Sequence, residues 1–352
     1  MLKRVKLLTL KAAKSLGVFE LFLRSRWRKN RLLILGYHGI SQDDEHLWNP
    51  ELYMTSKEFR ARMMMCKELG CNVLRLEDAL QKLYAGNLPE RSLVLTFDDG
   101  CYSFYQKAFP VIKELDWPVT VYLTSYYSNF NRPVFDVMCS YLLWKGSNRI
   151  IDGDEFIKNG GRFDLSRAAE RSAAALAIRS FASENRLSGI EKDALLISLA
   201  DRLDVDYEAI LSKRILHILS PNEIARLGAE GVDIQLHTHR HCSPSNHQFF
   251  LRELEDNRRF IKEFTNISAS HFCYPSGMYK LQCLPWLHES NVISATTCEP
   301  GLVKRNTNPL TLPRFLDTRL LHPVEFEGWL CGFSSLLPRG PLRADTIIKS
   351  SY

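Results

Sequence analysis

The chain has 352 residues, of which 45% are hydrophobic and 24% are charged, and its formal net charge is +6. This composition is typical of a globular protein with one large or two smaller domains, and no apolar run is long enough to span a bilayer. The nine cysteines form no Cys-x-x-Cys pair, and the basic N-terminus lacks the apolar core of a secretory signal, so we expect reduced thiols and a cytoplasmic protein.

The basic charge is concentrated at the N-terminus. Residues 1–31 contain ten Lys or Arg and one acid, Glu20, so this segment is net +9 and the rest of the chain is net −3. A body without basic excess argues against a nucleic-acid partner. Apolar residues at spacings of three and four, from Val5 to Leu23, predict one amphipathic helix over 1–31. Two interpretations stay open: a helix packed across the body with its charges in water, or an interfacial helix on an anionic membrane surface with Trp27 near the headgroups.

From residue 32 onward, strand and helix signals alternate. A capping box, Thr55 with Glu58, begins one helix, and Gly70 ends it. The alternation of strands and helices predicts a mostly parallel sheet. The predicted strands are 32–37, 72–74, 93–97 and 118–123, and the predicted helices are 55–70, 77–84 and 102–115.

Residues 125–219 interrupt this order. They contain helical stretches at Arg167–Phe181 and Ile190–Leu203 and no clear strand, which predicts a helical insertion on the loop side of the sheet. A second capping box, Ser220 with Glu223, marks the return of the alternation. The strands expected after it are 232–236, 271–274 and 292–296, and the helices are 245–264 and 279–290.

Polar side chains follow these strands where they end. Asp98 and Asp99 come after the strand at 93–97, and His237 and His241 come after the strand at 232–236. Because parallel strands open their C-terminal ends on one face, the two sets should lie together. Two histidines and one carboxylate leave open positions on a divalent ion, which is a hydrolytic arrangement, and the second carboxylate is free to act as a base. Taken alone, Asp-Asp-Gly also suits an ordinary turn.

The strand ends resemble the first three motifs of the polysaccharide deacetylases, the NodB-homology group or carbohydrate esterase family four. The matching stretches are Thr96-Phe97-Asp98-Asp99-Gly100, His237-Thr238-x-x-His241 and Phe272-x-Tyr274-Pro275-x-Gly277, with further similarity at Leu35–Gly39 and Leu312–Arg314. The resemblance covers 32–124 and 220–330 and implies an α/β fold, a distorted (β/α)7 barrel. It leaves outside the basic helix 1–31, the helical insertion 125–219 and a C-terminal tail, 331–352.

The resemblance also implies roles for individual residues. Asp98 matches the general base, and Asp99, His237 and His241 match the metal ligands. Zn²⁺ suits such a set, with Co²⁺ and Ni²⁺ as alternatives. On the substrate side, Tyr274 and Pro275 match the segment that shapes the acetate pocket and offers a backbone N–H to the oxyanion, and Arg314 is a further expected contact.

Two positions depart from the family pattern. Many members supply the general acid from a late Leu-x-His motif, but His322 follows the last predicted strand and is followed by Pro323. We therefore prefer His38, at the end of the first strand, whose other interpretation is a histidine that caps its loop. Cys273 stands where many members have an arginine that orients the base. Arg314 can do that work from another strand end, unless it is a surface or interface arginine.

The sequence thus predicts a metal-dependent hydrolase that removes N-acetyl groups from an amino sugar in exopolysaccharide biosynthesis. A cytoplasmic enzyme would meet a lipid-linked or nucleotide-linked intermediate rather than a finished polymer, and residues 1–31 would hold it at the inner face of the membrane. The alternatives are a carbohydrate-binding member of the fold without catalysis, and a deformylase or other amidase acting on a lipid-linked sugar. The sequence does not set the oligomeric state.

Overall fold

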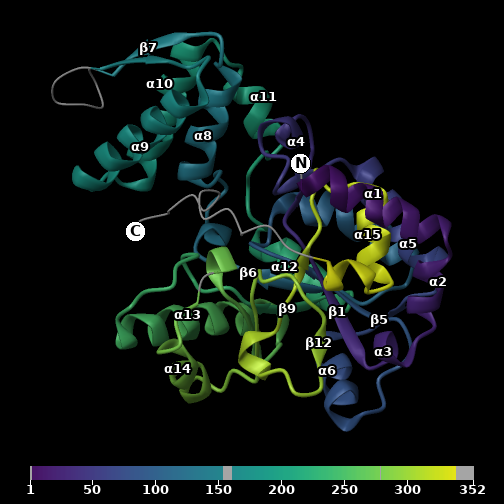
Figure 1. The fold of residues 1–352 in the computed structure, drawn as a ribbon. Coiled ribbons are helices and arrows are strands. Elements are labelled where there is room, and N and C mark those ends of the chain that lie inside the picture. The colour runs from purple at the N-terminus through teal and green to yellow at the C-terminus, as the bar shows by residue number, and fades with distance from the viewer. Residues whose placement is uncertain (1, 154–160, 278, 338–352) are drawn as a thin grey trace.

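A mostly parallel sheet forms the centre of the protein (Figure 1). The computed structural model describes residues 2–153, 161–277 and 279–337. β13 pairs in parallel with β1, and a bridge between Thr296 and Leu312 joins the segment before β13 to β11, which closes the sheet. The predicted distorted (β/α)7 barrel is therefore confirmed. Around the barrel the parallel strands are β1 (Arg31–Tyr37), β5 (Ser92–Phe97), β6 (Thr120–Leu123), β9 (Asp233–Leu236), β10 (His271–Cys273), β11 (Ser294–Thr296) and β13 (Phe315–Leu316).

Short strands extend this barrel at its edges. β4 (Asn72–Val73) pairs in parallel with the start of β5, and β12 (Val303–Lys304) pairs antiparallel with the start of β1. β2 (Gly39–Ile40) and β3 (Tyr53–Met54) form a separate parallel pair just after the end of β1. The sequence signals did not predict β12 and β13, which are only two residues long, and they did not predict the helix Pro323–Leu330 that follows.

Helices surround the strands. The helix predicted from Thr55 begins with its capping box formed, since Glu58 N donates to Thr55 Oγ1 at 3.2 Å and Thr55 N donates to Glu58 Oε2 at 2.8 Å. A π-helical turn at Phe104–Ala108 precedes α7, so the predicted helix 102–115 is present in two parts. The helices of the barrel are α4 (Glu45–Trp48), α5 (Ser56–Glu68), α6 (Leu76–Ala85), α7 (Phe109–Glu114), α12 (Pro221–Ala229), α13 (His247–Thr265), α14 (Cys283–Glu289) and α15 (Pro323–Leu330).

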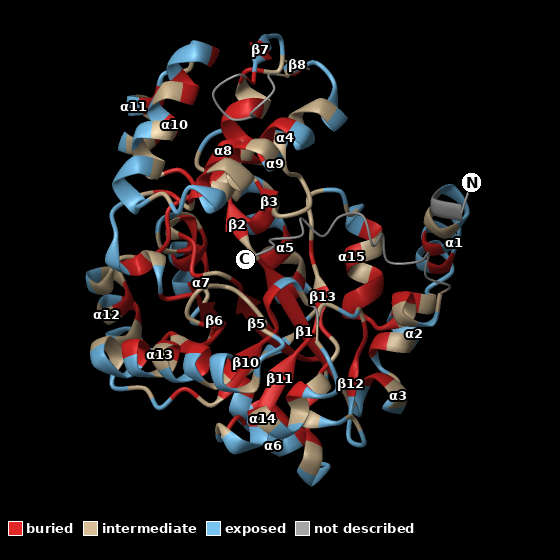
Figure 2. Cartoon of the chain, turned by 90° about the vertical axis from the view of Figure 1, so that its left-hand side faces the viewer, coloured by how far each residue is buried: buried red, intermediate tan, exposed pale blue. Residues whose placement is uncertain are grey.

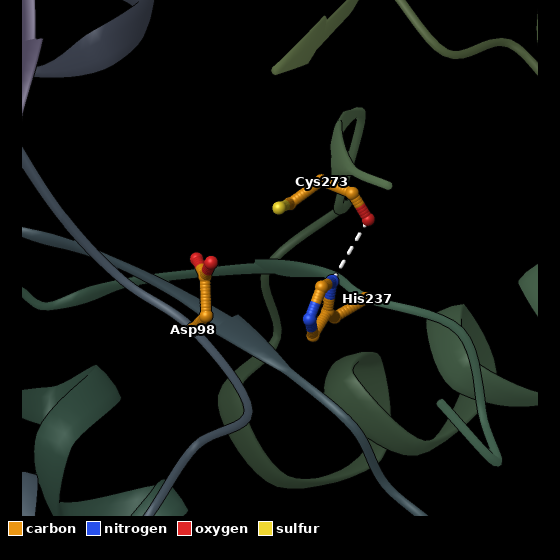
Figure 3. A group of neighbouring side chains, drawn as sticks. All are labelled: Asp98, His237 and Cys273. Carbon is orange, nitrogen blue, oxygen red and sulfur yellow. Dashed lines mark hydrogen bonds between the residues drawn. The ribbon is translucent and has the colours of Figure 1, made fainter. Parts of the chain in front are cut away.

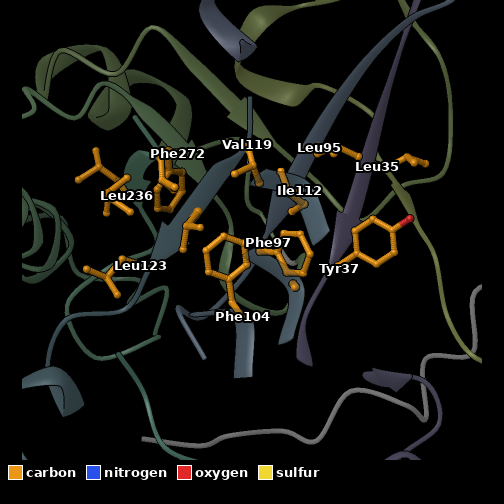
Figure 4. Packing of buried hydrophobic residues seen from close by; sticks show 14 of the residues in the cluster. Leu35, Tyr37, Leu95, Phe97, Phe104, Ile112, Val119, Leu123, Leu236 and Phe272 are labelled. Atoms are coloured by element: carbon orange, nitrogen blue, oxygen red, sulfur yellow. The ribbon is translucent and has the colours of Figure 1, made fainter. Parts of the chain in front are cut away.

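The main core lies between the strands and these helices (Figure 4). Leu35, Leu95, Phe97, Leu236 and Phe272 all have 0% exposure and belong to this layer. Each fully buried side chain of this kind contributes about 1.5–3 kcal/mol relative to exposure. A slip of one residue along a strand would turn its outer set inward, so this layer fixes the register of the strands and of the residues that follow them.

The stretch predicted as a helical insertion has its own core. Residues such as Tyr141, Leu142, Ile178 and Leu199 form a buried cluster that also includes Tyr53 of β3, next to the end of β1. Its helices therefore lie on the side where the strands end, as Figure 2 also shows. The expectation that this stretch holds no strand is wrong, because β7 and β8 pair antiparallel. The elements are α8 (Phe135–Lys145), β7 (Ile150–Asp152), β8 (Arg162–Asp164), α9 (Ala168–Glu184), α10 (Gly189–Leu203) and α11 (Tyr207–Ser212).

The N-terminal segment is three helices rather than the single helix that the spacing predicted. α1 (Leu2–Ser15) ends before Gly17, whose φ of 73° favours glycine, and Ser25 separates α2 (Val18–Leu23) from α3 (Arg26–Lys29). Trp27 packs edge-on against Phe22 within this segment. Among the described helices, none is both long and apolar enough to cross a membrane. At the other end, the predicted tail includes a 3₁₀ turn at Phe333–Leu336, and residues 338–352 lie outside the described part of the chain.

Candidate active site

The alternation of β5 determines where the first carboxylate points. Leu95 and Phe97 face the outer core, whereas Val94 and Thr96 face the opposite way, toward the inside of the barrel. Asp98 continues the inward series, and its backbone N–H donates to the carbonyl oxygen of Tyr37 at 2.9 Å. Asp98 is consequently buried, with 2% exposure.

The next two residues turn the chain away. Asp99 and Gly100 have φ of 68° and 73°, in the left-handed region that Asp and Gly tolerate best. A Cβ on Gly100 would lie 2.4 Å from Leu123 Cδ1, so only glycine fits here. The turn leaves the Asp99 side chain 26% exposed, and it separates two adjacent carboxylates into different environments.

Arg314 holds Asp98 inside the barrel. Its Nη1 and Nη2 donate to Asp98 Oδ1 and Oδ2, each at 2.6 Å, and Nη1 also donates to Thr96 Oγ1 at 3.2 Å. Arg314 has 0% exposure, so the interpretation of a surface or interface arginine is wrong. Burial alone would raise the pKa of Asp98, but the Arg314 guanidinium keeps that pKa below its usual value.

Two small neighbours make room for this guanidinium. Arg314 lies just before β13, beside β1, and a Cβ on Gly36 of β1 would lie 3.1 Å from Arg314 Nε and 2.5 Å from Leu316 Cδ2. On the other side, Arg314 Nη2 lies 3.3 Å from Cys273 Sγ. The residue expected as a substrate contact is thus fully engaged with Asp98, which makes it a positioning residue in this structure.

Two histidines converge on Asp99. His237 Nε2 and His241 Nε2 each lie 3.3 Å from Asp99 Oδ1, and their ring centroids are 4.9 Å apart. His237 Nδ1 donates to the carbonyl oxygen of Cys273 at 2.8 Å, which fixes the ring with its Nε2 turned toward Asp99. The histidine loop is bent by Thr238 and His241, with φ of 63° and 55°, values that carry strain in a β-branched residue such as threonine.

The arrangement of Asp99, His237 and His241 fits a divalent cation. Asp99 Oδ1 is buried and has no hydrogen-bond partner among the described residues, although two imidazole nitrogens lie 3.3 Å away. Ligands that sit ~2.0–2.1 Å from a tetrahedral ion lie about 3.3 Å from one another. A buried carboxylate oxygen that faces two imidazole nitrogens and has no hydrogen-bond partner is a suitable ligand for a metal ion, which would supply positive charge at this place. The three ligand atoms lie within 4.8 Å of one another.

A second group, Asp98, His237 and Cys273, is also close enough to suggest a metal site (Figure 3). This second group does not suit a metal ion. Both oxygens of Asp98 are already bonded to Arg314, whose guanidinium also contacts Cys273 Sγ. A second cation there would face that guanidinium at close range in a buried setting. In Figure 3, the His237 ring turns its Nδ1 to the Cys273 carbonyl rather than to the sulfur.

The two candidates for the general acid lie in different places. His38 follows β1, is 18% exposed, and has its Nε2 3.6 Å from Asp98 Oδ2. His322 is exposed and caps the start of α15, where its Nδ1 accepts from Val324 N at 3.1 Å. The structure brings His38 together with Asp98, whereas it uses His322 as a helix cap.

Tyr274 and Pro275 are buried, and Tyr274 packs in the outer core with Phe272 rather than facing the inside of the barrel. Tyr274 is 1% exposed, its hydroxyl donates to the carbonyl oxygen of Leu310 at 2.9 Å, and its N–H donates to the carbonyl oxygen of Thr296 at 3.2 Å. Proline has no N–H, and Gly277 N donates to the carbonyl oxygen of Tyr274. Ser276, with φ of 57°, is the remaining residue of this turn whose N–H can serve a ligand.

Two buried polar residues of α13 hold the histidine loop, and the sequence analysis missed both. Asn257 accepts from His237 N at 2.9 Å and donates to Leu123 O at 3.0 Å, so it joins β6 and β9. Glu253 accepts from Arg240 N at 2.7 Å. Both have 0% exposure. The signal was present, because 253 and 257 share the apolar face of the predicted helix with Leu254 and Phe250.

Comparisons with known proteins identify the family to which the chain belongs. A family model described as "Polysaccharide deacetylase" matches residues 85–152 and 179–290, about half of the chain. The poly-beta-1,6-N-acetyl-D-glucosamine N-deacetylase of Escherichia coli K12 is 27% identical over 100 residues, which are 28% of this chain and 15% of that protein. The enzyme of the same name from Staphylococcus epidermidis RP62A is 27% identical over 110 residues, 28% of this chain and 37% of that protein. The chain therefore matches well under two thirds of the length of these relatives.

Solved structures share the fold across most of the chain. The deacetylase PplD of Streptococcus pyogenes, in complex with acetate, aligns with a TM-score of 0.56 at 17% identity, covering 88% of this chain and 99% of that one. IcaB from Ammonifex degensii aligns with a TM-score of 0.53 at 16% identity, covering 86% and 97%. At this level of identity the likeness concerns the fold.

Proposed function

The chain belongs to the polysaccharide deacetylase family, and we propose that it is a metal-dependent hydrolase that removes N-acetyl groups from an amino-sugar substrate. The observation that carries the proposal is the different environment of two adjacent carboxylates. Asp99 presents an unsatisfied oxygen to His237 and His241, while Asp98 is held by Arg314 beside His38. One carboxylate is thus suited to bind an ion and the other to move a proton.

Asp99, His237 and His241 would hold the ion, with Zn²⁺ as the first candidate and Co²⁺ or Ni²⁺ as alternatives. When bound, such an ion supplies Lewis acidity to the amide carbonyl and to water. His237 is held ready for this role by its Nδ1–H bond to Cys273 O and its backbone bond to Asn257.

Asp98 acts as the general base in this proposal. It takes a proton from the attacking water, and Arg314 keeps it ionised and correctly turned by donating to both of its oxygens. His38 then gives a proton to the departing sugar nitrogen, because an amide anion is too poor a leaving group to depart unprotonated. The N–H of Ser276 is the candidate donor to the developing oxyanion.

Two exposed aromatic rings suggest where the sugar lies. Tyr126 and Phe130 are 37% and 40% exposed, and they follow β6, which lies between the strands that carry the carboxylates and the histidines. Tyr126 N donates to the carbonyl oxygen of His239 at 2.8 Å, which ties the ring to the histidine loop. A flat apolar ring with a polar tip suits the face of a pyranose.

The substrate we propose is an intermediate of exopolysaccharide biosynthesis, lipid-linked or nucleotide-linked, met in the cytoplasm. The support is chemical: all nine cysteines are free thiols, and Cys66, Cys101, Cys139, Cys273, Cys283 and Cys331 are buried, as suits a reducing compartment.

The test is acetate release from N-acetylated sugars by metal-free protein with added Zn²⁺, Co²⁺ or Ni²⁺. The wild type should release acetate and Asp98→Asn should not. The control is Asp204→Asn, since the Asp204 side chain is 81% exposed and pairs with Arg149 on the surface, and this variant should keep full activity. Formate in place of acetate would show a deformylase. No release from any acylated sugar would overturn the proposal in favour of a binding protein.

A further inference from the structure

The outer face of α1 carries an apolar stripe that no described part of the chain covers. Val5 is 54% exposed and Leu8 is 66% exposed, and Leu16, directly after the helix, is 78% exposed. With the exposed Ala12, these residues follow the spacing of three and four that places side chains on one face of a helix. Leu21 of α2 is also 71% exposed. We name Val5, Leu8, Ala12 and Leu16 the outer stripe.

The opposite face of α1 is fixed to the body. Leu10 and Ala13 are buried in a cluster with Val324 of α15. Two ion pairs flank this contact, Lys6 with Glu325 and Lys14 with Glu327. These apolar and charged contacts of the inner face fix the orientation of α1 on the body, so the outer stripe faces away from the body. Exposure of the stripe is therefore a feature of the folded protein and not of a loose terminus.

Basic side chains accompany the outer stripe. Arg4 and Lys11 are exposed on one side of it, and neither forms an ion pair with any residue that the structure describes. Arg26 of α3 is exposed as well. The segment 1–31 as a whole is net +9, against −3 for the rest of the chain. In Figures 1 and 2, α1 and α2 lie on the flank of the barrel opposite α13, so this charge is gathered on one side of the molecule.

We propose that the outer stripe and its basic residues dock on the surface of an anionic lipid bilayer. Apolar side chains at this spacing enter the boundary between headgroups and acyl chains, while Arg4 and Lys11 meet the phosphates. The contact is interfacial, since α1 has 14 residues and lies along the body of the protein. It places the protein at a membrane, where a lipid-linked sugar would be found, but it does not depend on the proposed activity.

Other occupants fit the charges or the stripe less well. A second copy joined by a twofold axis would bring the Arg4 and Lys11 side chains of two copies close together, which is repulsive. A nucleic acid would bind the basic residues but offers nothing to the exposed leucines. An anionic bilayer accommodates both features at once.

The experiment is sedimentation of the full-length protein with vesicles of phosphatidylcholine alone or with 30% phosphatidylglycerol. The wild type should bind the anionic vesicles at least tenfold more tightly than the neutral ones. Leu8→Gln/Leu16→Gln keeps the net charge and should weaken binding more than tenfold. Arg4→Gln/Lys11→Gln keeps the stripe and should weaken it by roughly 25-fold, since each basic residue near an anionic surface contributes about fivefold.

The matched control is Ile190→Gln/Ile197→Gln. These residues lie on α10 and are 76% and 48% exposed, so the pair loses a similar apolar area away from α1 and should bind like the wild type. Circular dichroism verifies that each variant is folded. If the leucine variant binds vesicles as well as the wild type, or if the wild type does not distinguish the two vesicles, the proposal is wrong. A wild-type dimer that becomes monomeric in the leucine variant would assign the stripe to a second copy instead. Loss of acetate release with intact vesicle binding would reject only the proposed function.

Discussion

Replacing Arg314 by methionine tests the central claim that a buried ion pair positions the base. The substitution keeps most of the length of the side chain and removes its charge and all of its donors. It leaves Asp98, 2% exposed, without the two 2.6 Å bonds that satisfy both of its oxygens. An unpaired carboxylate would then remain inside the barrel, where water does not compensate it.

The expected loss of stability is large. Removing one partner of a buried ion pair costs about 3–5 kcal/mol. In a domain of 150–250 residues each kcal/mol lowers Tm by about 2–4 °C, so Arg314→Met should lower Tm by roughly 6–20 °C. The double variant Asp98→Asn/Arg314→Met removes both charges and should recover most of this loss, because replacing both partners of a buried pair is often nearly neutral.

Thermal and urea unfolding of the wild type, both single variants and the double variant measure the coupling directly. The control is Arg60→Met, which breaks an exposed pair with Glu114, at 2.8 Å, and should change Tm little. The variants at 98 and 314 should all lose acetate release. If Arg314→Met is as stable as the wild type, or if the double variant is less stable than Arg314→Met alone, then the Asp98–Arg314 ion pair does not stabilise the fold.

Three further expectations concern the metal, the sugar and acid stability. Asp99→Asn should weaken Zn²⁺ binding by roughly 100-fold or more, and Asp98→Asn far less, in a chelator competition; equal effects would contradict their separate roles. Tyr126→Ala should raise KM severalfold while kcat is kept, and Tyr126→Phe should not; an unchanged KM would remove the ring from the sugar site. Burial lowers the pKa of His217 from its usual value near 6.5 to about 4, so its contribution to stability is present above pH 6.5 and is lost as the pH falls toward 4. His217→Gln should therefore unfold less steeply with acid over that range, and an equal slope would show that His217 is charged in the fold.

The strand ends were predictable because their signals are local. A buried run such as Leu93–Phe97 marks a central strand, and strands of a parallel sheet end at one face. That logic alone brought Asp99 and His237 together, although they are 138 positions apart in the chain. The family resemblance then separated the roles of Asp98 and Asp99, and the turn at Asp99 supplies the physical reason for the separation.

The features that the sequence did not predict depend on tertiary contacts and on short elements that leave no periodic pattern. The prediction of a single helix over 1–31 was wrong because it considered only the spacing of apolar residues. Gly17, with its positive φ, separates α1 from α2 and allows the chain to change direction between them. The same spacing placed Leu8, which is exposed, on one face with Phe19 and Leu23, which are buried in the cluster that includes Val324 of α15. The hairpin of β7 and β8 has three residues in each strand, too few for a period to show.

The sequence pattern also gave no sign that deleting the N-terminal helices would disturb the fold. Deleting residues 1–28 was the natural way to test a membrane role for the N-terminus. Arg28, however, has 0% exposure, and its guanidinium donates to the carbonyl oxygens of Leu330 at 2.8 Å and Arg31 at 2.7 Å. The truncation would remove this buried link and expose the cluster around Leu10. Substitutions on the outer stripe avoid that damage, because the residues they change make their contacts with solvent.

The position of Arg314 explains why Cys273 can stand where many family members have an arginine. The buried Asp98 carboxylate needs a cationic side chain that donates to both of its oxygens. An arginine from any neighbouring strand end can meet this requirement. Arg314 reaches it from the closing segment of the barrel because Gly36 leaves room for Nε, and because the small thiol of Cys273 leaves room for Nη2 at 3.3 Å. An arginine side chain at 273 would bring a second guanidinium into that same buried space, where two like charges repel strongly. The two arginines therefore exclude one another, and Gly36, Cys273 and Arg314 form one alternative solution to the same electrostatic requirement.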